Sequence, residues 1–314
     1  MTAPTATRGG PATLLGETSA LFELALPMSV LQFAVYFIFP ETASVVGLQL
    51  GKEYLAGFSL GSLTGNLTLL TITVGVVSAA DTLMPRAFAT GQYSELGKLA
   101  IRTFVVAMIV MLVPCILLVS SMEPIYRVFH QNATVAHIAT QWLKVFVIGA
   151  PFALLVRICQ RFLGSQRVVW PIGISTSVGA FLIHPVLLWI LVPRMGFVGS
   201  AVAIVITQFM QIFLALVYLN YFPVHHPDSW GKLTWESFCE ACQLRPMLAY
   251  AKLSIGGVLS FTEWCFWVSA TDWFGNVRSF NMLPPVLCEM QPLLKASLFV
   301  RAFERCVWAS LRKP

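Results

Sequence analysis

Residues 197–220 read FVGSAVAIVITQFMQIFLALVYLN, an apolar stretch without a charged side chain. A helix that crosses the hydrocarbon core of a bilayer needs ~20 predominantly apolar residues, because every backbone polar group must find its partner inside the segment. Other stretches meet the same requirement, and short polar loops separate them. The predicted spans are 23–46, 54–80, 98–121, 137–157, 168–192, 197–220 and 248–270. The sequence therefore predicts an all-α, polytopic membrane helix bundle.

Composition supports this fold class and excludes several functions. Of the 314 residues, 57% are apolar and 11% are charged, and the mean hydropathy is +0.76. Soluble domains carry about a quarter charged residues, so a soluble fold is excluded. The net charge of +6 could indicate nucleic-acid binding, but the Lys and Arg residues are spread among short loops without a basic stripe. We expect no nucleic-acid partner.

Motifs for catalysis and metal binding are missing from the sequence. It contains no P-loop, no nucleophile elbow and no His-Glu-x-x-His pattern, so we expect no enzyme activity. The seven cysteines lie mostly in or beside apolar segments, which predicts no disulfide framework. Cys239 and Cys242 form a single C-x-x-C without a second pair at finger spacing. We therefore expect neither a metal nor a cofactor.

The predicted organisation along the chain has five parts. They are a disordered tail at 1–16, a six-helix lobe at 17–222, a cytoplasmic loop at 223–247, a seventh helix at 248–272 and a divergent basic tail at 273–314. This last part either crosses as an eighth helix or lies on a membrane surface.

The distribution of Lys and Arg predicts a cytoplasmic N-terminus, since cytoplasmic loops of membrane proteins carry the positive excess. The basic residues placed inside are Arg8, Arg86, Lys98, Arg102, Arg157, Arg161, Arg167, Lys232, Arg245 and Lys252. The opposite side holds only Lys52, Arg127, Lys144 and Arg194.

Glu263 is the most informative polar residue. A carboxylate at membrane depth costs several kcal/mol unless it is paired or protonated. A carboxyl that gains and loses a proton would suit a proton-coupled cation exchanger, and the neighbouring Trp264 offers an aromatic face to organic cations. The alternative for Glu263 is a hydrogen bond to a neighbouring helix, and for the aromatic residues around it a place in the interfacial belt.

Further polar residues within the predicted spans are candidates for the same pathway. His184 can titrate near neutral pH, and Glu41 is a second carboxylate within a span. The uncharged candidates are Gln32, Asn66 and Gln208, and helix-to-helix hydrogen bonds are the alternative role for all of them. Asp81 and Arg86 lie at the cytoplasmic mouth of the second span, where gating or helix capping is expected.

Several landmarks occur in a familiar order. They are Gly47-Leu48-Gln49-Leu50-Gly51 followed by Leu55-Ala56, Gly75 with Ser78-Ala79-Ala80-Asp81-Thr82-Leu83, Gln160-Arg161-Phe162-Leu163, and Glu263-Trp264. In these segments the chain resembles the multidrug and toxic compound extrusion (MATE) transporters, particularly the eukaryotic, plant-like branch, over roughly residues 17 to 272. The resemblance implies a MATE-type lobe and efflux of xenobiotics or organic cations by antiport with protons or sodium.

The chain also departs from the family's pattern. Pro85-Arg86 stands where the signature continues Ser-Gln, Val268 replaces a second Glu, and Thr42 occupies the position of a bacterial Asp. The family usually has twelve helices in two lobes, whereas this chain ends after one lobe and one further helix. Two functions stay open: an antiporter completed by a second copy or a missing C-terminal lobe, and a truncated, transport-inactive membrane protein that binds a partner.

The expected partners are membrane lipids and small cationic or amphipathic substrates. The sequence leaves open the substrate, the coupling ion, the oligomeric state and the membrane, which could be the plasma membrane or a vacuolar or other organellar membrane.

Overall fold

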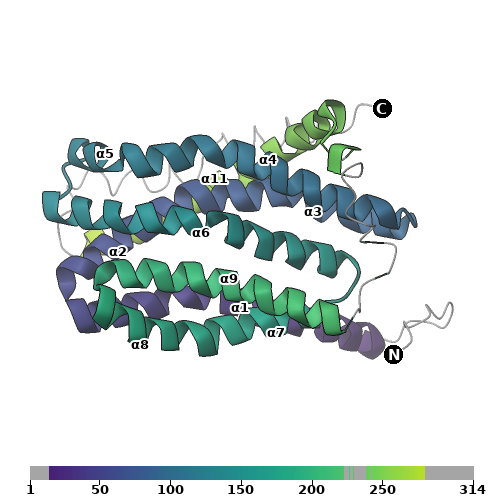
Figure 1. The fold of residues 1–314 in the computed structure, drawn as a ribbon, viewed down its shortest axis with the longest axis horizontal. Coiled ribbons are helices and arrows are strands. Elements are labelled where there is room, and N and C mark those ends of the chain that lie inside the picture. Colours follow the sequence, from purple (N-terminus) through teal and green to yellow (C-terminus); the bar gives the residue numbers. More distant parts are fainter. Residues whose placement is uncertain (1–13, 223–225, 227–228, 230–237, 241, 280–314) are drawn as a thin grey trace. The chain divides into compact units, whose positions relative to one another are not determined.

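This computed structural model describes residues 14–222, 226, 229, 238–240 and 242–279. Side chains are described in these ranges except at 14–24, 27 and 264–279. Helices form all the regular structure of the described residues. The elements (Figure 1) are α1 (Leu14–Leu50), α2 (Lys52–Gly65), the π-helix η1 (Asn66–Leu70), α3 (Thr71–Ala89), α4 (Tyr93–Ser120), α5 (Met122–Val128), α6 (Ala133–Ser165), α7 (Trp170–Val178), the π-helix η2 (Gly179–Ile183), α8 (His184–Met195), α9 (Phe197–Tyr221) and α11 (Leu244–Ser279). The chain divides into two units after Glu263, and the packing below belongs to the first.

Six segments of the described chain are long and apolar enough to cross a membrane. They are Met28–Leu50, Lys52–Ala89, Tyr93–Ser120, Ala133–Ser165, Trp170–Met195 and Phe197–Tyr221. The prediction of an all-α, multi-pass membrane fold is confirmed. The seventh predicted span, 248–270, lies within α11, which is not one of these six segments. Lys252 and Glu263 lower the hydropathy of α11, and its crossing of the membrane stays a prediction.

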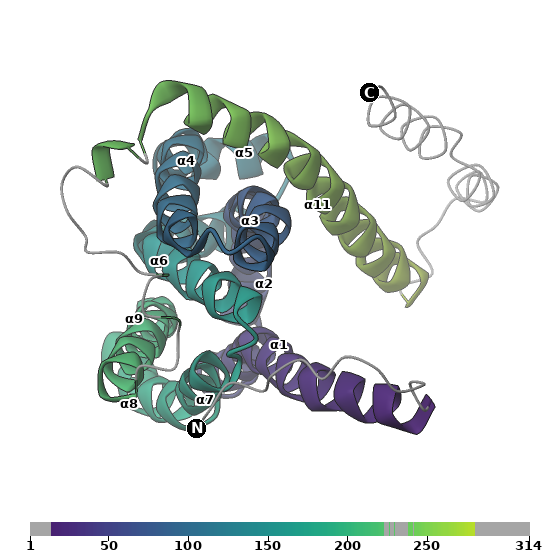
Figure 2. The same cartoon turned by 90° about the vertical axis from the view of Figure 1, so that its right-hand side faces the viewer.

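Helix α6 is the central helix of the first unit. It packs against α2, α3, α4 and α9, and Figure 2 shows it between the α3–α4 pair and the group formed by α7, α8 and α9. Its 33 residues span about 50 Å, and the helix is considerably longer than the predicted span 137–157. Arg157, expected in a cytoplasmic segment, therefore lies inside the helix with only 8% of its surface exposed. The helix continues beyond the predicted span, and the expected cytoplasmic side of Arg157 stays a prediction.

Small residues bring α2 and α6 together. Gly57, Gly61 and Gly65 recur at four-residue spacing, which places them on one face of α2. They face, in order, Ile138, Trp142 and Phe146 of α6. A methyl group on Gly61 would lie 3.2 Å from the Trp142 ring. Helix association in a bilayer depends on such close packing, because lipid tails are as apolar as the side chains.

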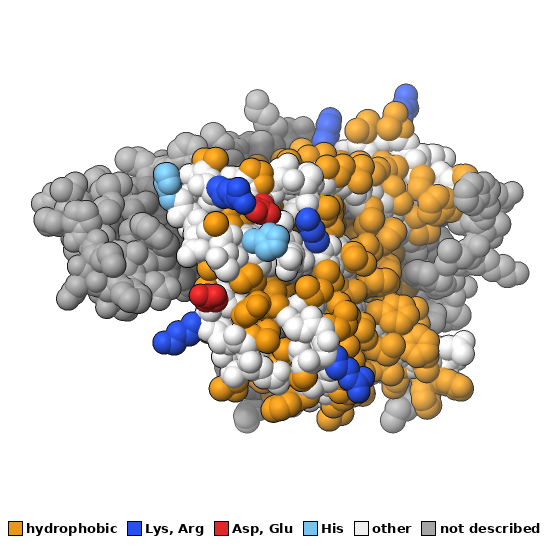
Figure 3. Space-filling model, turned by 60° about the vertical axis from the view of Figure 1, so that its left-hand side comes forward, with side chains coloured by type: hydrophobic (Ala, Val, Ile, Leu, Met, Phe, Trp, Pro, Cys, Tyr) orange, Lys and Arg blue, Asp and Glu red, His pale blue; other side chains and the backbone are white. Residues whose placement is uncertain are grey.

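The outer face of α4 is suited to lipid. Its exposed side chains recur at three- and four-residue spacing and include Ile109, Leu112, Val113 and Ile116. Figure 3 shows wide hydrophobic surface on the molecule and only a few charged side chains in the view. This pattern fits a bundle whose sides contact hydrocarbon and whose charges lie toward the helix ends.

Candidate functional site

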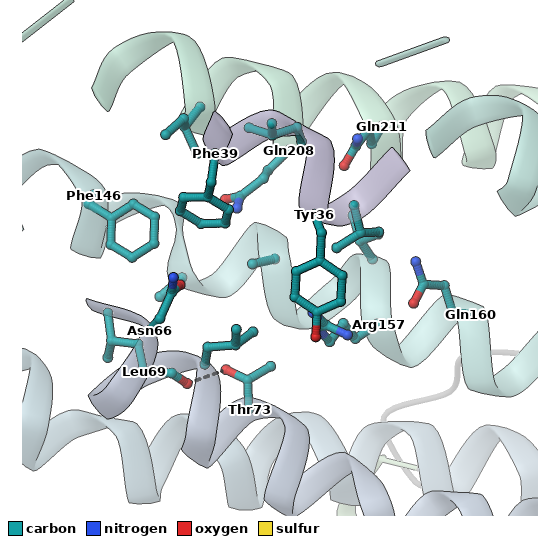
Figure 4. A pocket seen from close by; sticks show the side chains of 17 residues that line it. Tyr36, Phe39, Asn66, Leu69, Thr73, Phe146, Arg157, Gln160, Gln208 and Gln211 are labelled. Atoms are coloured by element: carbon teal, nitrogen blue, oxygen red, sulfur yellow. Dashed lines mark hydrogen bonds between the residues drawn. The ribbon is translucent and has the colours of Figure 1, made fainter. Parts of the chain in front are cut away.

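A cavity of ≈ 70 Å³ lies between α1, η1, α3, α6 and α9 (Figure 4). Its polar lining consists of Tyr36, Asn66, Thr73, Arg157, Gln160, Gln208 and Gln211. Its apolar wall includes Phe39 and Phe146, whose ring centroids are 6.5 Å apart at an angle of 62°. A polar cavity of this size has room for water. It can therefore accept the polar end of a small molecule.

Arg157 gives the cavity its charge. It is the single charged residue in the lining, and it forms none of the ion pairs found in the described part of the chain. In Figure 4 the hydroxyl end of Tyr36, from α1, lies beside the Arg157 side chain on α6. A buried guanidinium keeps its proton in proteins, so the cavity is electropositive.

Three amide side chains around the cavity have a buried end without a hydrogen-bond partner among the described residues. The atoms are Asn66 Oδ1, Gln160 Nε2 and Gln208 Oε1. Buried polar groups in proteins are nearly always paired, so these amides are suited to bind a ligand or water. Gln211 is already engaged, because its Nε2 donates to the Thr176 carbonyl at 3.2 Å.

The local backbone shapes this lining. Gly149 leaves room for one of the amides, since a methyl group there would lie 2.8 Å from Gln208 Oε1. The π-helix η1 begins at Asn66 and is continued by α3, where Thr73 Oγ1 donates to the Leu69 carbonyl at 2.7 Å (Figure 4). Single π-helical turns inside α-helices occur frequently at functional sites.

His184 forms a second polar cluster, on α8. It is fully buried, with Nε2 2.9 Å from Thr42 Oγ1 of α1 and Nδ1 2.9 Å from Thr207 Oγ1 of α9. The π-helix η2 immediately precedes it and Pro185 follows it. A proline has no backbone N–H to continue the α-helical ladder, which fits a widened turn at this point.

Both threonine hydroxyls donate their proton to a backbone carbonyl. Thr42 Oγ1 donates to the Ile38 carbonyl at 2.7 Å, and Thr207 Oγ1 donates to the Ala203 carbonyl at 2.7 Å. A hydroxyl has a single proton, so both oxygens are left as acceptors toward the imidazole. A doubly protonated imidazole donates a hydrogen bond to each threonine oxygen. A neutral imidazole has one nitrogen without a proton, and that nitrogen accepts a hydrogen bond only if one threonine hydroxyl turns away from its carbonyl. The cluster therefore responds to the protonation state of His184.

The remaining candidates from the sequence do not join either group. Glu41 is half-buried, and its Oε2 has no partner among the described residues. Gln32 and Glu263 are exposed, and Trp264 is helical with a side chain outside the described set. Asn66 and Gln208 are thus the predicted residues that reach the cavity, and His184 lies in its own cluster.

Asp81 and Arg86 at the helix mouth are both exposed. Asp81 Oδ1 pairs with Arg161 Nε at 2.9 Å, which links α3 to α6. Their predicted gating role stays a prediction.

Sequence reasoning missed several residues of these clusters, namely Tyr36, Arg157, Gln160, Thr207 and Gln211. A signal for two of them was present, because Arg157 and Gln160 are three residues apart and apolar residues continue to Phe162. A helix extended through this segment would have placed both on one face.

Together, six membrane-length helices, an electropositive internal cavity and a buried histidine cluster define a multi-pass membrane protein of the transporter class. The family model MatE matches residues 27–190, and the chain belongs to this family of transporters, which are not enzymes. It is 28% identical to multidrug and toxin extrusion protein 1 of Danio rerio over 258 residues, which is 81% of this chain and 42% of the relative. It is 29% identical to the uncharacterized transporter C323.07c of Schizosaccharomyces pombe over 79% of this chain and 45% of the relative. The chain thus spans less than half the length of these relatives.

Solved structures show the same fold. The eukaryotic MATE transporter AtDTX14 matches with a TM-score of 0.72 and 23% identity, over 81% of this chain and 56% of that structure. An inward-facing multidrug resistance MATE family transporter matches with a TM-score of 0.62 and 14% identity, over 77% of this chain and 55% of that structure. The expected family and the MATE-type lobe are therefore confirmed.

Proposed function

We propose that this chain forms one lobe of a secondary transporter that exports small organic molecules in exchange for protons, with His184 as a proton-carrying side chain. The observation that carries the proposal is the position of the imidazole between two threonine oxygens whose hydroxyl protons point to backbone carbonyls. Proton exchange at such a ring requires a change of hydrogen bonds in α1 or α9.

The same hydrogen bonds connect His184 to the cavity. Ile38, whose carbonyl accepts the Thr42 hydroxyl, is itself part of the cavity lining. If Thr42 turns its hydroxyl toward a neutral His184, α1 loses this bond close to Pro40, where the helix already lacks a backbone donor. Protonation can thereby shift the segment of α1 that lines the cavity, which is the coupling that antiport needs.

Other parts of the pathway are included in the proposal. Glu263 is the second candidate for proton exchange, with Trp264 beside it as a contact for cationic or amphipathic xenobiotics, and sodium is the alternative coupling ion. The names of the curated relatives support multidrug or toxin extrusion as the activity. Alternating access rocks one lobe against another, so we propose that a second copy or a further lobe completes the pathway.

Transport by the full chain in proteoliposomes tests the role of His184. We expect His184→Gln to abolish the component of dye transport that depends on an imposed pH difference, because the glutamine amide does not take up and release a proton as an imidazole does. His137→Gln is the matched control, since His137 is exposed at the far end of the bundle. Equal pH dependence in wild type and both variants would reject His184 as the proton carrier.

A further inference from the structure

We infer that the cavity around Arg157 is a subsite for the carboxylate of a small aromatic or amphipathic organic acid. The inference rests on the proposed transport function and specifies which chemical class this part of the pathway receives. It differs from the cationic class that the sequence predicts from Glu263 and Trp264.

The first argument is charge. A guanidinium with 8% of its surface exposed requires a counter-charge or several hydrogen bonds, because burying an unpaired ion is costly. No carboxylate lies among the residues that line the cavity. Asp81, the acidic residue on the neighbouring α3, pairs instead with Arg161, one turn further along α6. An organic anion would supply the missing charge, whereas an organic cation would be repelled by Arg157, although Asn66 Oδ1 and Gln208 Oε1 could still accept hydrogen bonds from a donor elsewhere in the cavity.

The second argument is the donor set. A guanidinium presents parallel N–H groups that match the two oxygens of a carboxylate, which makes such pairs both strong and directional. Gln160, one helical turn from Arg157, has a buried Nε2 without a partner among the described residues, and it lines the same cavity. The Tyr36 hydroxyl lies beside Arg157 (Figure 4) and provides a third donor. These groups can together satisfy a carboxylate.

The third argument is size and shape. A volume of ≈ 70 Å³ favours a small acid over a drug-sized molecule, since pockets that enclose drug-sized ligands measure about 300–1,000 Å³. The rings of Phe39 and Phe146 offer an edge-to-face aromatic wall beside the polar groups. An aromatic acid would place its carboxylate at Arg157 and its ring against this wall.

Binding measurements on the purified full chain in detergent test the inference. The probes are benzoate, benzamide and benzylammonium, which share one ring and carry a negative, a neutral and a positive head. We expect the wild-type chain to prefer benzoate over the other two, and Arg157→Gln to weaken benzoate roughly ten- to hundredfold while leaving benzamide unchanged. The benzoate affinity of Arg157→Lys should lie between those of the wild type and Arg157→Gln, because a lysine keeps the charge but loses the bidentate geometry.

Lys144→Gln is the matched control, because it removes one positive charge from an exposed position on the same helix. Circular dichroism and size-exclusion chromatography identify variants that fold, and Arg157→Lys keeps the test valid if Arg157→Gln does not. A preference for benzylammonium, or equal loss of benzoate affinity in the Lys144 and Arg157 variants, would overturn the inference.

Failure here is distinguishable from failure of the proposed function. Benzoate binding is measured without a pH gradient and does not involve His184, whereas the transport assay depends on the gradient. Absent benzoate binding with intact proton-driven transport would reject only the carboxylate subsite. Benzoate binding without any proton-driven transport would support the subsite and reject proton antiport by assemblies of this chain alone.

Discussion

Glu123, at the start of α5, accepts hydrogen bonds from two basic side chains. Its Oε2 lies 3.4 Å from His137 Nδ1, and its Oε1 accepts from Arg127 Nη2 at 2.7 Å. The hydrogen bond with His137, followed by that with Arg127, holds the pKa of the Glu123 carboxyl below its usual value. A lowered folded-state pKa stabilises the protein above the unfolded carboxyl pKa of about 4.3, and the effect is lost as the pH falls through the folded value.

We therefore expect Glu123→Gln to lower the thermal unfolding temperature by a small amount at neutral pH. The difference from wild type should shrink as the pH falls below about 4, where the wild-type carboxyl also becomes protonated. Thermal melts in detergent across this pH range measure it. Glu53→Gln serves as the control, since Glu53 is exposed and forms none of the ion pairs of the described chain. If the unfolding temperatures of wild type and Glu123→Gln differ by the same amount at every pH, the charge of the Glu123 carboxylate does not stabilise the fold.

At this scale the sequence identifies polar residues but not their partners. His184 and Asn66 could be singled out because a polar group in an apolar span is costly and therefore conspicuous. Thr42 and Thr207 could not be paired with His184, because they lie on separate helices 142 and 23 residues away. Arg157, the last residue of the predicted span 137–157, was counted with the basic residues of the cytoplasmic side, because the sequence pattern alone does not show that the helix continues to Ser165.

Helix α11 approaches α3 at a point where a side chain has no room. A methyl group on Gly257 would overlap Ser78 Oγ and lie 2.6 Å from the Gly75 carbonyl oxygen, whereas a methyl group on Gly256 would meet open space. Tyr250 supports the same contact, since its hydroxyl donates to the Val76 carbonyl at 3.0 Å.

This pair of glycines gives an internally controlled stability test. Gly256→Ala should stabilise the helix by up to about 1 kcal/mol, because alanine has the higher helix propensity. Gly257→Ala gains the same propensity but should be destabilised overall, since forcing a methyl into a filled contact costs typically ~1–3 kcal/mol. Unfolding in a graded denaturing detergent compares the two. A Gly257 variant as stable as the Gly256 variant would mean that α11 is not held against α3.

At the scale of elements, hydropathy predicts where helices occur better than where they end. The centres of the first six predicted spans all lie within the observed membrane-length segments. The ends differ, because charged residues such as Arg157 and Arg161 are compatible with a helix that extends past the hydrocarbon. α1 begins at Leu14 within the predicted tail, and α11 continues to Ser279 beyond the predicted end at 272, while residues 1–13 and 280–314 lie outside the described set.

For the whole bundle, ion pairs bring the predicted cytoplasmic segments to one end. Lys98 Nζ lies 2.8 Å from Glu240 Oε1, which joins α4 to the segment before α11, and Asp81 of α3 pairs with Arg161 near the C-terminal end of α6. Ser120, at the other end of α4, belongs to the opposite side. Lys232, which contributes to the predicted charge bias, lies outside the described residues.

Cysteine labelling tests this orientation. In a variant that retains only Cys239, which is exposed, we expect a membrane-impermeant maleimide to react only after the membrane is opened. In a cysteine-free background, Ser120→Cys should react from outside intact cells, because positive-inside topology places that end of α4 outward. The reverse result for the two positions would invert the topology.

The π-helix η2 changes the helical register of the residues that follow it in the fifth apolar segment. A π turn accommodates one residue more than an α turn, so it acts like a single-residue insertion that the helix absorbs without breaking. Residues after Ile183 are consequently rotated by about 100° from where an uninterrupted α-helix would place them. A homologous sequence that is one residue shorter between 179 and 183 would turn the residue aligned with His184 away from Thr42 and Thr207. A gap at this place in an alignment would therefore mark a change in the proton site, even where the histidine itself is retained.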